Sequence, residues 1–204
     1  MATKKKAAPK KAAKKSAPKK AAKKSAAKKS APKKSNKSAD DASLIREFFL
    51  DGIKDIYYAE KYLVKQMPKM LKAAGAQELR TAIEDHMEVT MEQVARLEEV
   101  FSLLEERPQG KKCEAILGLV EEGLSIISET KKGTATRDCG IIMAAQKIEH
   151  YEIASYGGLA QLAKTLGLEE VKNLLGQTLE EEKQTDELLT QVAESSININ
   201  AAGE

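Results

Sequence analysis

Two glutamates stand three residues apart in the stretch KIEHYEIASY at positions 147–156. If the stretch is helical, Glu149 and Glu152 lie on one face, because residues three apart in a helix are neighbours. On a face that packs into a core, a carboxylate must take up a proton or find a partner. Leucine would serve stability better at both positions. The pair therefore indicates chemistry, and a divalent cation is a suitable partner for clustered carboxylate oxygens.

The same interruption of an apolar stripe occurs in three other segments, each time near the middle. The interrupting residues are Glu60, His86 and Glu182, the last followed by Asp186. Carboxylates gathered at one level of a core would repel one another unless cations neutralised them, and two divalent ions would nearly do so. Oxygen-rich ligation with an imidazole suits iron, with manganese as the second candidate. The sequence therefore predicts a two-ion metal site formed by Glu60, His86, Glu149, Glu152 and Glu182.

Ordinary structural roles are open for each of these residues taken singly. A glutamate in an apolar stripe commonly lies at its edge, and a lone histidine is commonly a hydrogen-bonded core residue. The register of the last segment is also open, because a competing stripe points Glu181 inward in place of Glu182. His150 falls about 100° round an ideal helix from Glu149, which favours a surface or supporting position over ligation. The coincidence across four segments is what favours a shared site.

Helices must position this site, because apolar residues after Ser43 recur every three or four positions. Glycine-rich or proline-containing stretches separate the segments, and Pro68 predicts a kink or break within the first one. One segment, at 113–129, is short and falls between the second and third long ones. This order predicts an all-α, ferritin-like four-helix bundle with an extra short crossover helix, since a bundle of that topology needs one long return connection.

The charge of the chain divides it sharply. Residues 1–39 hold 16 of the 34 lysine and arginine residues and no acid, and all 31 acidic residues follow them. The basic segment also lacks leucine, isoleucine, valine and aromatic residues, so it cannot bury enough apolar surface to offset chain entropy. We therefore expect a disordered tail at 1–42, a helical bundle at 43–195 and a short flexible C-terminus at 196–204.

A lysine-rich tail of this kind favours a polyanionic partner. Each lysine that neutralises a DNA phosphate releases a counterion, and nothing in residues 1–39 is suited to reading bases. We therefore expect the tail to bind DNA or another polyanion without sequence specificity, and the protein to associate with the nucleoid. The repeated lysine, alanine, serine and proline pattern resembles the tails of linker histones. A solubilising tail, or an address read by a receptor, is the alternative.

Other features bear on location. The two cysteines, Cys113 and Cys139, are too few for a disulfide framework and favour a reducing cytoplasm. No apolar run approaches the roughly 18 residues of a membrane span, and no apolar stretch follows the charged N-terminus as in a secretory signal. We therefore expect a cytoplasmic protein without a membrane partner.

The blocks that carry the candidate ligands resemble the ferritin-like stress-protein family of the YciE/YciF type, over about 44–193. They read DIYYAEKYLVKQMPKM, HMEVTMEQVARLEEVF, KKCEAILGLVEEG, AAQKIEHYEIASYGGLAQLAKTLG and LLGQTLEEEKQTDELL. The resemblance implies a ferritin-like bundle, usually a homodimer, with a di-iron centre and a link to stress responses. The general ferritin-like pattern has Glu-x-x-His on two helices. Here the residue three before His86 is Ile83, and the residue three after Glu182 is Thr185. This departure leaves the number of ligands open.

Different functions fit these features, and the sequence does not decide whether the protein is an enzyme. One is a metal-dependent redox protein that consumes peroxide or oxidises iron while its tail holds DNA. Another is an architectural protein of the nucleoid that uses the bundle as a dimerisation module. A third is an interaction module whose polar core no longer binds metal.

Overall fold

The computed structural model describes residues 38–204, with side chains from Leu44 onward. Most of the predicted disordered tail lies outside this range, and so do most of the residues expected to bind the polyanion. The described secondary structure is helical throughout. It comprises α1 (Ser38–Ala73), α2 (Gln77–Leu103), α3 (Glu114–Glu129), α4 (Ala135–Thr165), α5 (Glu169–Val192), a π-helical turn η1 (Ala193–Ile197) and α6 (Asn198–Ala202).

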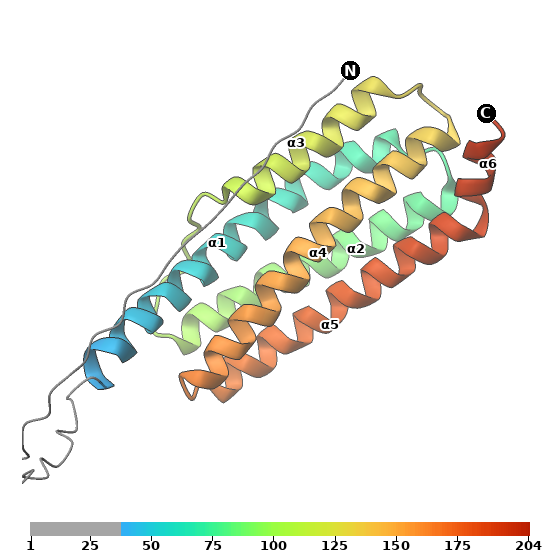
Figure 1. The fold of residues 1–204 in the computed structure, drawn as a ribbon. Helices are drawn as coiled ribbons and strands as arrows, with labels where there is room; N and C mark the ends of the chain where they lie inside the picture. The colour runs from blue at the N-terminus through green and yellow to red at the C-terminus, as the bar shows by residue number, and fades with distance from the viewer. Residues whose placement is uncertain (1–37) are drawn as a thin grey trace, which may run out of the picture. The chain divides into compact units, whose positions relative to one another are not determined.

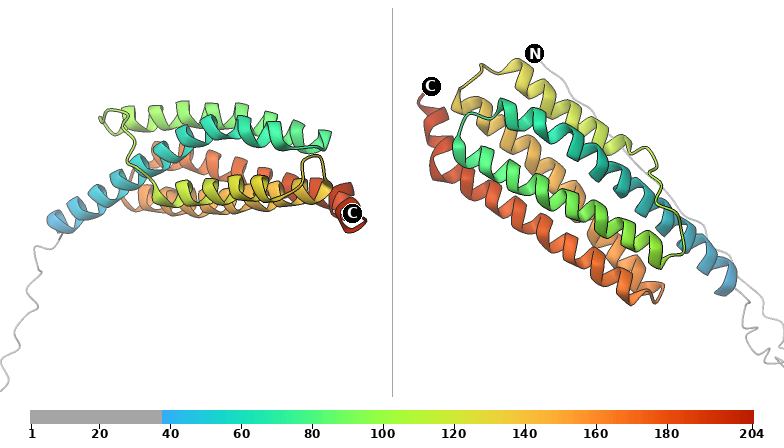
Figure 2. Two further views of the ribbon diagram at one scale, coloured as in Figure 1. Left: turned by 90° about the horizontal axis from the view of Figure 1, so that it is seen from above. Right: turned by 180° about the vertical axis from the view of Figure 1, so that it is seen from behind.

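The four long helices form the predicted bundle. Helix α1 packs against α2 and α4, and α5 packs against the other side of α2 and α4, so that each long helix has two long neighbours (Figure 1). Helix α3 lies outside this square against α1 and α4, and runs back along the bundle from the end of α2 to the start of α4 (Figure 2). The predicted crossover helix is confirmed. A continuous apolar core from all these helices fills the interior.

Local chemistry explains where several helices begin and end. Asp138 on α4 accepts hydrogen bonds from the backbone N–H groups of Gly75 and Ala76, both at 2.8 Å, and so stabilises the start of α2. The Thr134 hydroxyl caps α4 by accepting from the Arg137 N–H. Gly167 has a φ of 74°, the left-handed conformation that commonly follows the last residue of a helix.

The first helix differs from expectation at two places. It begins at Ser38, inside the segment 1–42 that the sequence assigned to the tail. It also continues through Pro68 to Ala73, so the break that was one of the two expectations for this proline does not occur. Pro68 is exposed, whereas Met67 and Met70 beside it are buried, so packing of the apolar face holds the helix together through the proline.

The C-terminal residues also differ from the flexible segment expected at 196–204, because they are helical. Ile197 is buried, and the Cys139 thiol donates a hydrogen bond to Asn198 Oδ1 at 3.2 Å. The Glu204 carboxylate accepts from the backbone N–H groups of Ala135 and Thr136, at 2.8 and 3.1 Å. These contacts anchor the segment at the N-terminus of α4. Across residues 38–204, no helix combines the length and apolar character that a bilayer crossing requires.

Candidate metal centre

Four of the five predicted ligands converge inside the bundle. His86 comes from α2, Glu149 and Glu152 from α4, and Glu182 from α5. One ligand atom from each lies within 4.8 Å of one atom from every other. The three glutamates are buried, and the histidine side chain is 10% exposed. Three helices thus bring one imidazole and three carboxyl groups together at mid-length of the bundle.

Glu60, the fifth predicted ligand, lies beside this group on α1. It is fully buried, and its Oε1 accepts a hydrogen bond from the hydroxyl of Tyr156. Its own charge is among the causes that raise the pKa of Glu152, so the two carboxyl groups are neighbours. We call the five residues Glu60, His86, Glu149, Glu152 and Glu182 the acidic centre. Tyr156 was not predicted as part of the site, although it stands one turn after Glu152 on the same stripe.

The acidic centre holds polar atoms that the protein itself does not satisfy. Within residues 44–204, eight buried side-chain nitrogen and oxygen atoms lack a hydrogen-bond partner, and seven of them belong to the centre. Both carboxylate oxygens of Glu152 and both of Glu182 are among them. The eighth is Oε1 of Gln93, a residue on α2. Buried polar atoms are normally paired, so seven unpaired atoms gathered in the acidic centre indicate a missing partner.

Burial sets the protonation of these groups when no cation is present. It raises the pKa of Glu60, Glu149 and Glu152 well above the usual range for glutamate, and the charges of the neighbouring carboxyl groups raise it further. Burial likewise raises the pKa of Glu182 to about 7. The metal-free centre therefore keeps protons at neutral pH, and a bound cation would displace them.

His86 is in the form that binds metals. Burial lowers its pKa to about 4, so the imidazole is neutral and its contact with Glu149, 3.3 Å from Nε2 to Oε1, is not an ion pair at neutral pH. The Thr185 hydroxyl donates to the Glu181 carbonyl at 3.1 Å and lies 3.3 Å from His86 Nδ1. Because that hydroxyl has one proton, we assign the imidazole proton to Nδ1. The unprotonated Nε2 then faces the carboxyl groups.

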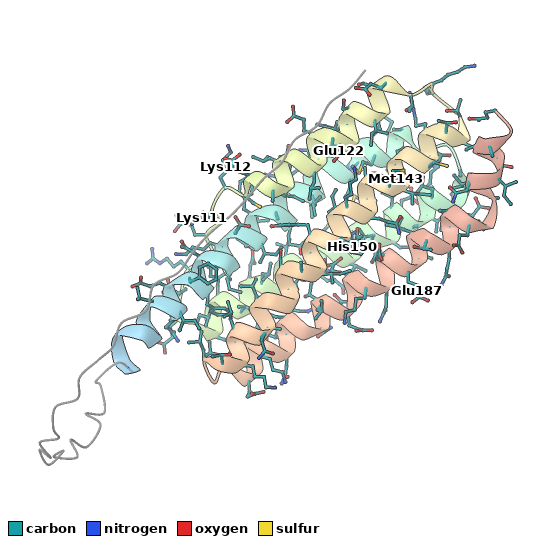
Figure 3. All side chains as sticks on the ribbon, viewed as in Figure 1. Lys111, Lys112, Glu122, Met143, His150 and Glu187 are labelled. Atoms are coloured by element: carbon teal, nitrogen blue, oxygen red, sulfur yellow. The ribbon has the colours of Figure 1, made fainter. Side chains whose placement is uncertain are left out.

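The open register of the last helix is decided in favour of Glu182. Glu181 points aside, where its two oxygens accept hydrogen bonds from Arg96 at 2.6 and 2.8 Å. Asp186 accepts instead from the side chain of Gln146 at 3.2 Å. His150 lies on the exposed side of α4 (Figure 3). Its Nε2 is 3.5 Å from Asp186 Oδ2. Neither the stripe pattern nor the spacing predicted Arg96, because its partner is on another helix.

The donor set fits a hard or borderline divalent cation. Carboxylate oxygens dominate, one neutral imidazole joins them, and no described cysteine takes part. Such a set suits ferrous iron or manganese better than a metal that prefers thiolates. Arg96, whose charge acts on Glu60 and Glu182, is hydrogen-bonded to Glu181 and Thr178 rather than to the centre. The residues present therefore fit the cation that the sequence predicted, without identifying it.

Comparisons with known proteins agree with this fold. The chain is 42% identical over 158 residues to Protein YciF of Escherichia coli, covering 77% of this chain and 95% of that protein. The crystal structure of the E. coli stress protein YciF matches with a TM-score of 0.71 and 40% identity, covering 78% of this chain and 98% of that one. YcfI from Rhodopseudomonas palustris matches with a TM-score of 0.71 and 36% identity, covering 74% and 96%.

These matches confirm the resemblance to the YciF type and the ferritin-like helical bundle predicted from the sequence. A family model, described as a domain of unknown function, matches residues 44–202. On this match and the identity to YciF, the chain belongs to the DUF892 family.

Proposed function

We propose that the acidic centre binds two divalent ions, iron or else manganese, and serves in a redox reaction that protects the cell under stress. The unsatisfied, buried carboxylate oxygens are the observation that carries this proposal. When bound, a pair of ferrous ions supplies two electrons, enough to reduce hydrogen peroxide and two protons to two waters, or dioxygen and two protons to hydrogen peroxide. YciF of E. coli is described as a stress protein, which is consistent with such a role.

The residues of the chain have separate parts in this proposal. His86, Glu149, Glu152 and Glu182 hold one set of donors within reach of a common ion. Glu60 offers further oxygen donors from α1, while the Tyr156 hydroxyl fixes one of its two oxygens. Thr185 orients the imidazole through Nδ1. The apolar core around the centre limits the access of water, which strengthens the interaction between the carboxylates and a cation.

We further propose that residues 1–39 hold the protein on DNA without sequence specificity. Sixteen lysines without a single acid support this part of the proposal. Removing peroxide or ferrous iron beside DNA would limit hydroxyl-radical damage there, which gives the two parts of the chain a common purpose. A homodimer is a proposal carried by the family resemblance, and light scattering of the whole chain tests it.

Metal analysis and an absorption spectrum of protein purified without chelator test the central claim. We expect two ions per chain, and loss of both the ions and peroxide consumption when Glu149 is replaced in Glu149→Ala. That variant should still bind DNA. A chain lacking residues 1–37 should lose DNA binding but keep the ions and peroxide consumption. This truncation leaves the bundle whole, because α1 begins at Ser38. A wild-type protein that takes up neither iron nor manganese would overturn the proposal.

An architectural role in the nucleoid is the second candidate. YcfI is described as a proposed structural protein, which favours this candidate for the family. It predicts DNA compaction that is unchanged in Glu149→Ala and abolished by removal of residues 1–37. Compaction assays on these two variants therefore separate the candidates.

A further inference from the structure

A second pocket lies at the surface, between α1 and the loop that joins α2 to α3. Its volume is about 300 Å³, which is within the range of pockets that bind small molecules. Three tyrosines and two lysines of α1 form one wall, and Pro108 and Gly110 from the loop form the other. No residue of the acidic centre lines this pocket, so it is a separate candidate site.

The loop wall is fixed against α1. The Lys111 N–H donates to the Lys54 carbonyl at 3.0 Å, and the Lys111 ammonium binds the Asp51 carboxylate at 2.8 Å (Figure 3). Gly110 lies so close to Tyr58 that a Cβ added to the glycine would come within 3.3 Å of the Tyr58 Cα. Glycine therefore allows this approach, and both walls are in place without a ligand.

Aromatic rings make up much of the α1 wall. The rings of Tyr58 and Tyr62, one turn apart, are nearly parallel, with their centroids 6.1 Å apart. Both residues are half-buried, so part of their surface is accessible. The third ring, that of Tyr57, is buried against Phe101, and its hydroxyl donates to Glu98 at 2.7 Å. Accessible rings of this kind are suited to stacking against a flat, unpaired base.

The two lysines of the wall make the pocket cationic. Lys61 and Lys65 are both exposed, and Lys61 donates to the Tyr57 hydroxyl at 3.1 Å. Among residues 44–204, neither ammonium group forms an ion pair with a carboxylate. This is notable because acidic residues outnumber basic ones after residue 39. Two free ammonium groups beside accessible rings favour a ligand that is both aromatic and anionic.

We propose that this pocket binds a nucleotide, with its base against Tyr58 and Tyr62 and its phosphate at Lys61 and Lys65. Free nucleotides and unpaired stretches of nucleic acid share this chemistry. In a DNA duplex the bases are stacked on one another, so they are not free to lie against a tyrosine. The site is independent of the metal and of the proposed duplex binding by the basic tail.

Titration calorimetry of the whole chain with adenosine monophosphate, adenosine and inorganic phosphate tests the pocket. The monophosphate should bind at least about tenfold more tightly than either of the others, because only it offers both a base and a phosphate. Tyr62→Leu should weaken its binding by at least about tenfold through loss of stacking. Tyr62→Phe keeps the ring and should stay within about twofold of wild type.

The lysines give a second test that does not depend on the fold of a tyrosine variant. Both are exposed, and replacing both in Lys61→Gln with Lys65→Gln should weaken binding of the monophosphate by about tenfold. Lys69→Gln with Lys72→Gln removes the same charge from α1 outside the pocket. This matched control should stay within about twofold, because salt screens distant charges. The basic tail is unchanged in every variant and adds equally to each titration.

Short single-stranded and duplex oligodeoxyadenylates distinguish the two sources of the nucleotide. A larger effect of Tyr62→Leu on the single strand than on the monophosphate assigns the pocket to unpaired nucleic acid, and a smaller one assigns it to the free nucleotide. Binding of the duplex should not change, since the tail carries it.

Two sets of results would overturn the proposal. The first is absence of monophosphate binding at about 1 mM, or equal affinity for inorganic phosphate, which would leave only an anion site. The second is wild-type affinity in Tyr62→Leu or in the double lysine variant. If Tyr62→Leu instead converts a dimeric wild type to monomers and neither protein binds the monophosphate, a second copy of the chain covers the pocket.

Discussion

Two polar clusters share helices α2 and α5, and the protein treats them in opposite ways. In the first, which we call the paired cluster, Arg96 binds both oxygens of Glu181 and also donates to the hydroxyl of Thr178 at 2.6 Å. The second is the acidic centre, to which the next residue, Glu182, contributes two buried oxygens without a partner. Two neighbouring glutamates of one helix thus differ, because Glu181 is paired with an arginine and the oxygens of Glu182 have no partner.

The difference shows what the acidic centre lacks. Burial alone would raise the pKa of Glu181, but the hydrogen bonds from Arg96 and Gln93 outweigh it and hold the pKa below the usual value. For Glu182 burial prevails, and the pKa rises to about 7. Where a glutamate is structural, this chain provides its cation. At the acidic centre it provides none among the described residues, which is expected if the cation comes from solution.

The largest expected difference between the two clusters is in metal affinity, when one glutamate at a time is replaced by glutamine. Glu182→Gln should lower metal affinity by about a thousandfold, because loss of a mere supporting partner already costs 10- to 100-fold. Glu181→Gln should change it by less than about threefold. Isothermal titration with ferrous iron or manganese in the absence of oxygen measures both. Equal affinities in the two variants would contradict the division into two clusters.

Thermal unfolding of the metal-free variants gives the control. Glu182→Gln removes a buried acid that has no partner, so the metal-free protein should be at least as stable as wild type. Glu181→Gln weakens an ion pair and should be less stable. A fall in metal affinity together with unchanged folding shows that Glu182 acts on the ion rather than on the fold.

Removing the cation of the paired cluster has the next largest effect. In Arg96→Met, Glu181 loses its partner in a part of the bundle where the two side chains are 11% and 25% exposed. We expect the free energy of unfolding to fall by about 2 to 3 kcal/mol, below the range for a fully buried pair. Urea unfolding measures this change. The double variant Arg96→Met with Glu181→Leu should recover most of it, since no charge is then left without a partner.

How far the sequence predicts this molecule depends on whether a feature is periodic or tertiary. The helices, the crossover and the pair Glu149 and Glu152 can be predicted from the spacing of residues along the sequence alone. The choice between Glu181 and Glu182 does not, because both stripes contain leucines and differ by about 100° of rotation. It depends on Arg96, which comes from another helix.

The C-terminus teaches the same point. The helical end of the chain is held by burial of Ile197 and by the contact of Glu204 with α4, and neither is visible in local propensity. Ligand types could be predicted from the sequence, since each interrupts an apolar stripe. Their partners could not, since partners are set by how the helices pack.

The smallest expected difference between the two clusters is in how their contributions to stability depend on pH. The folded pKa of Glu182 lies near 7, above its ordinary value of 4.5. Its contribution to stability is therefore full below about pH 4.5 and is lost as the pH rises through about 7. From about pH 5 to pH 7, the metal-free protein should lose about 1 to 2 kcal/mol of unfolding free energy through this residue.

Glu182→Gln should remove that loss, because glutamine does not titrate. Glu181 behaves in the opposite sense, since its pKa is lowered and its contribution disappears only as the pH falls through the folded value. Metal ions should also reverse the trend of the wild type, because protons compete with them for the same carboxylates and binding strengthens as the pH rises. Urea unfolding at several pH values, with and without manganese, measures all of these trends. A metal-free wild type and Glu182→Gln with parallel profiles would mean that Glu182 ionises freely, and a carboxylate that ionises freely inside this core would need a partner among the protein's own residues.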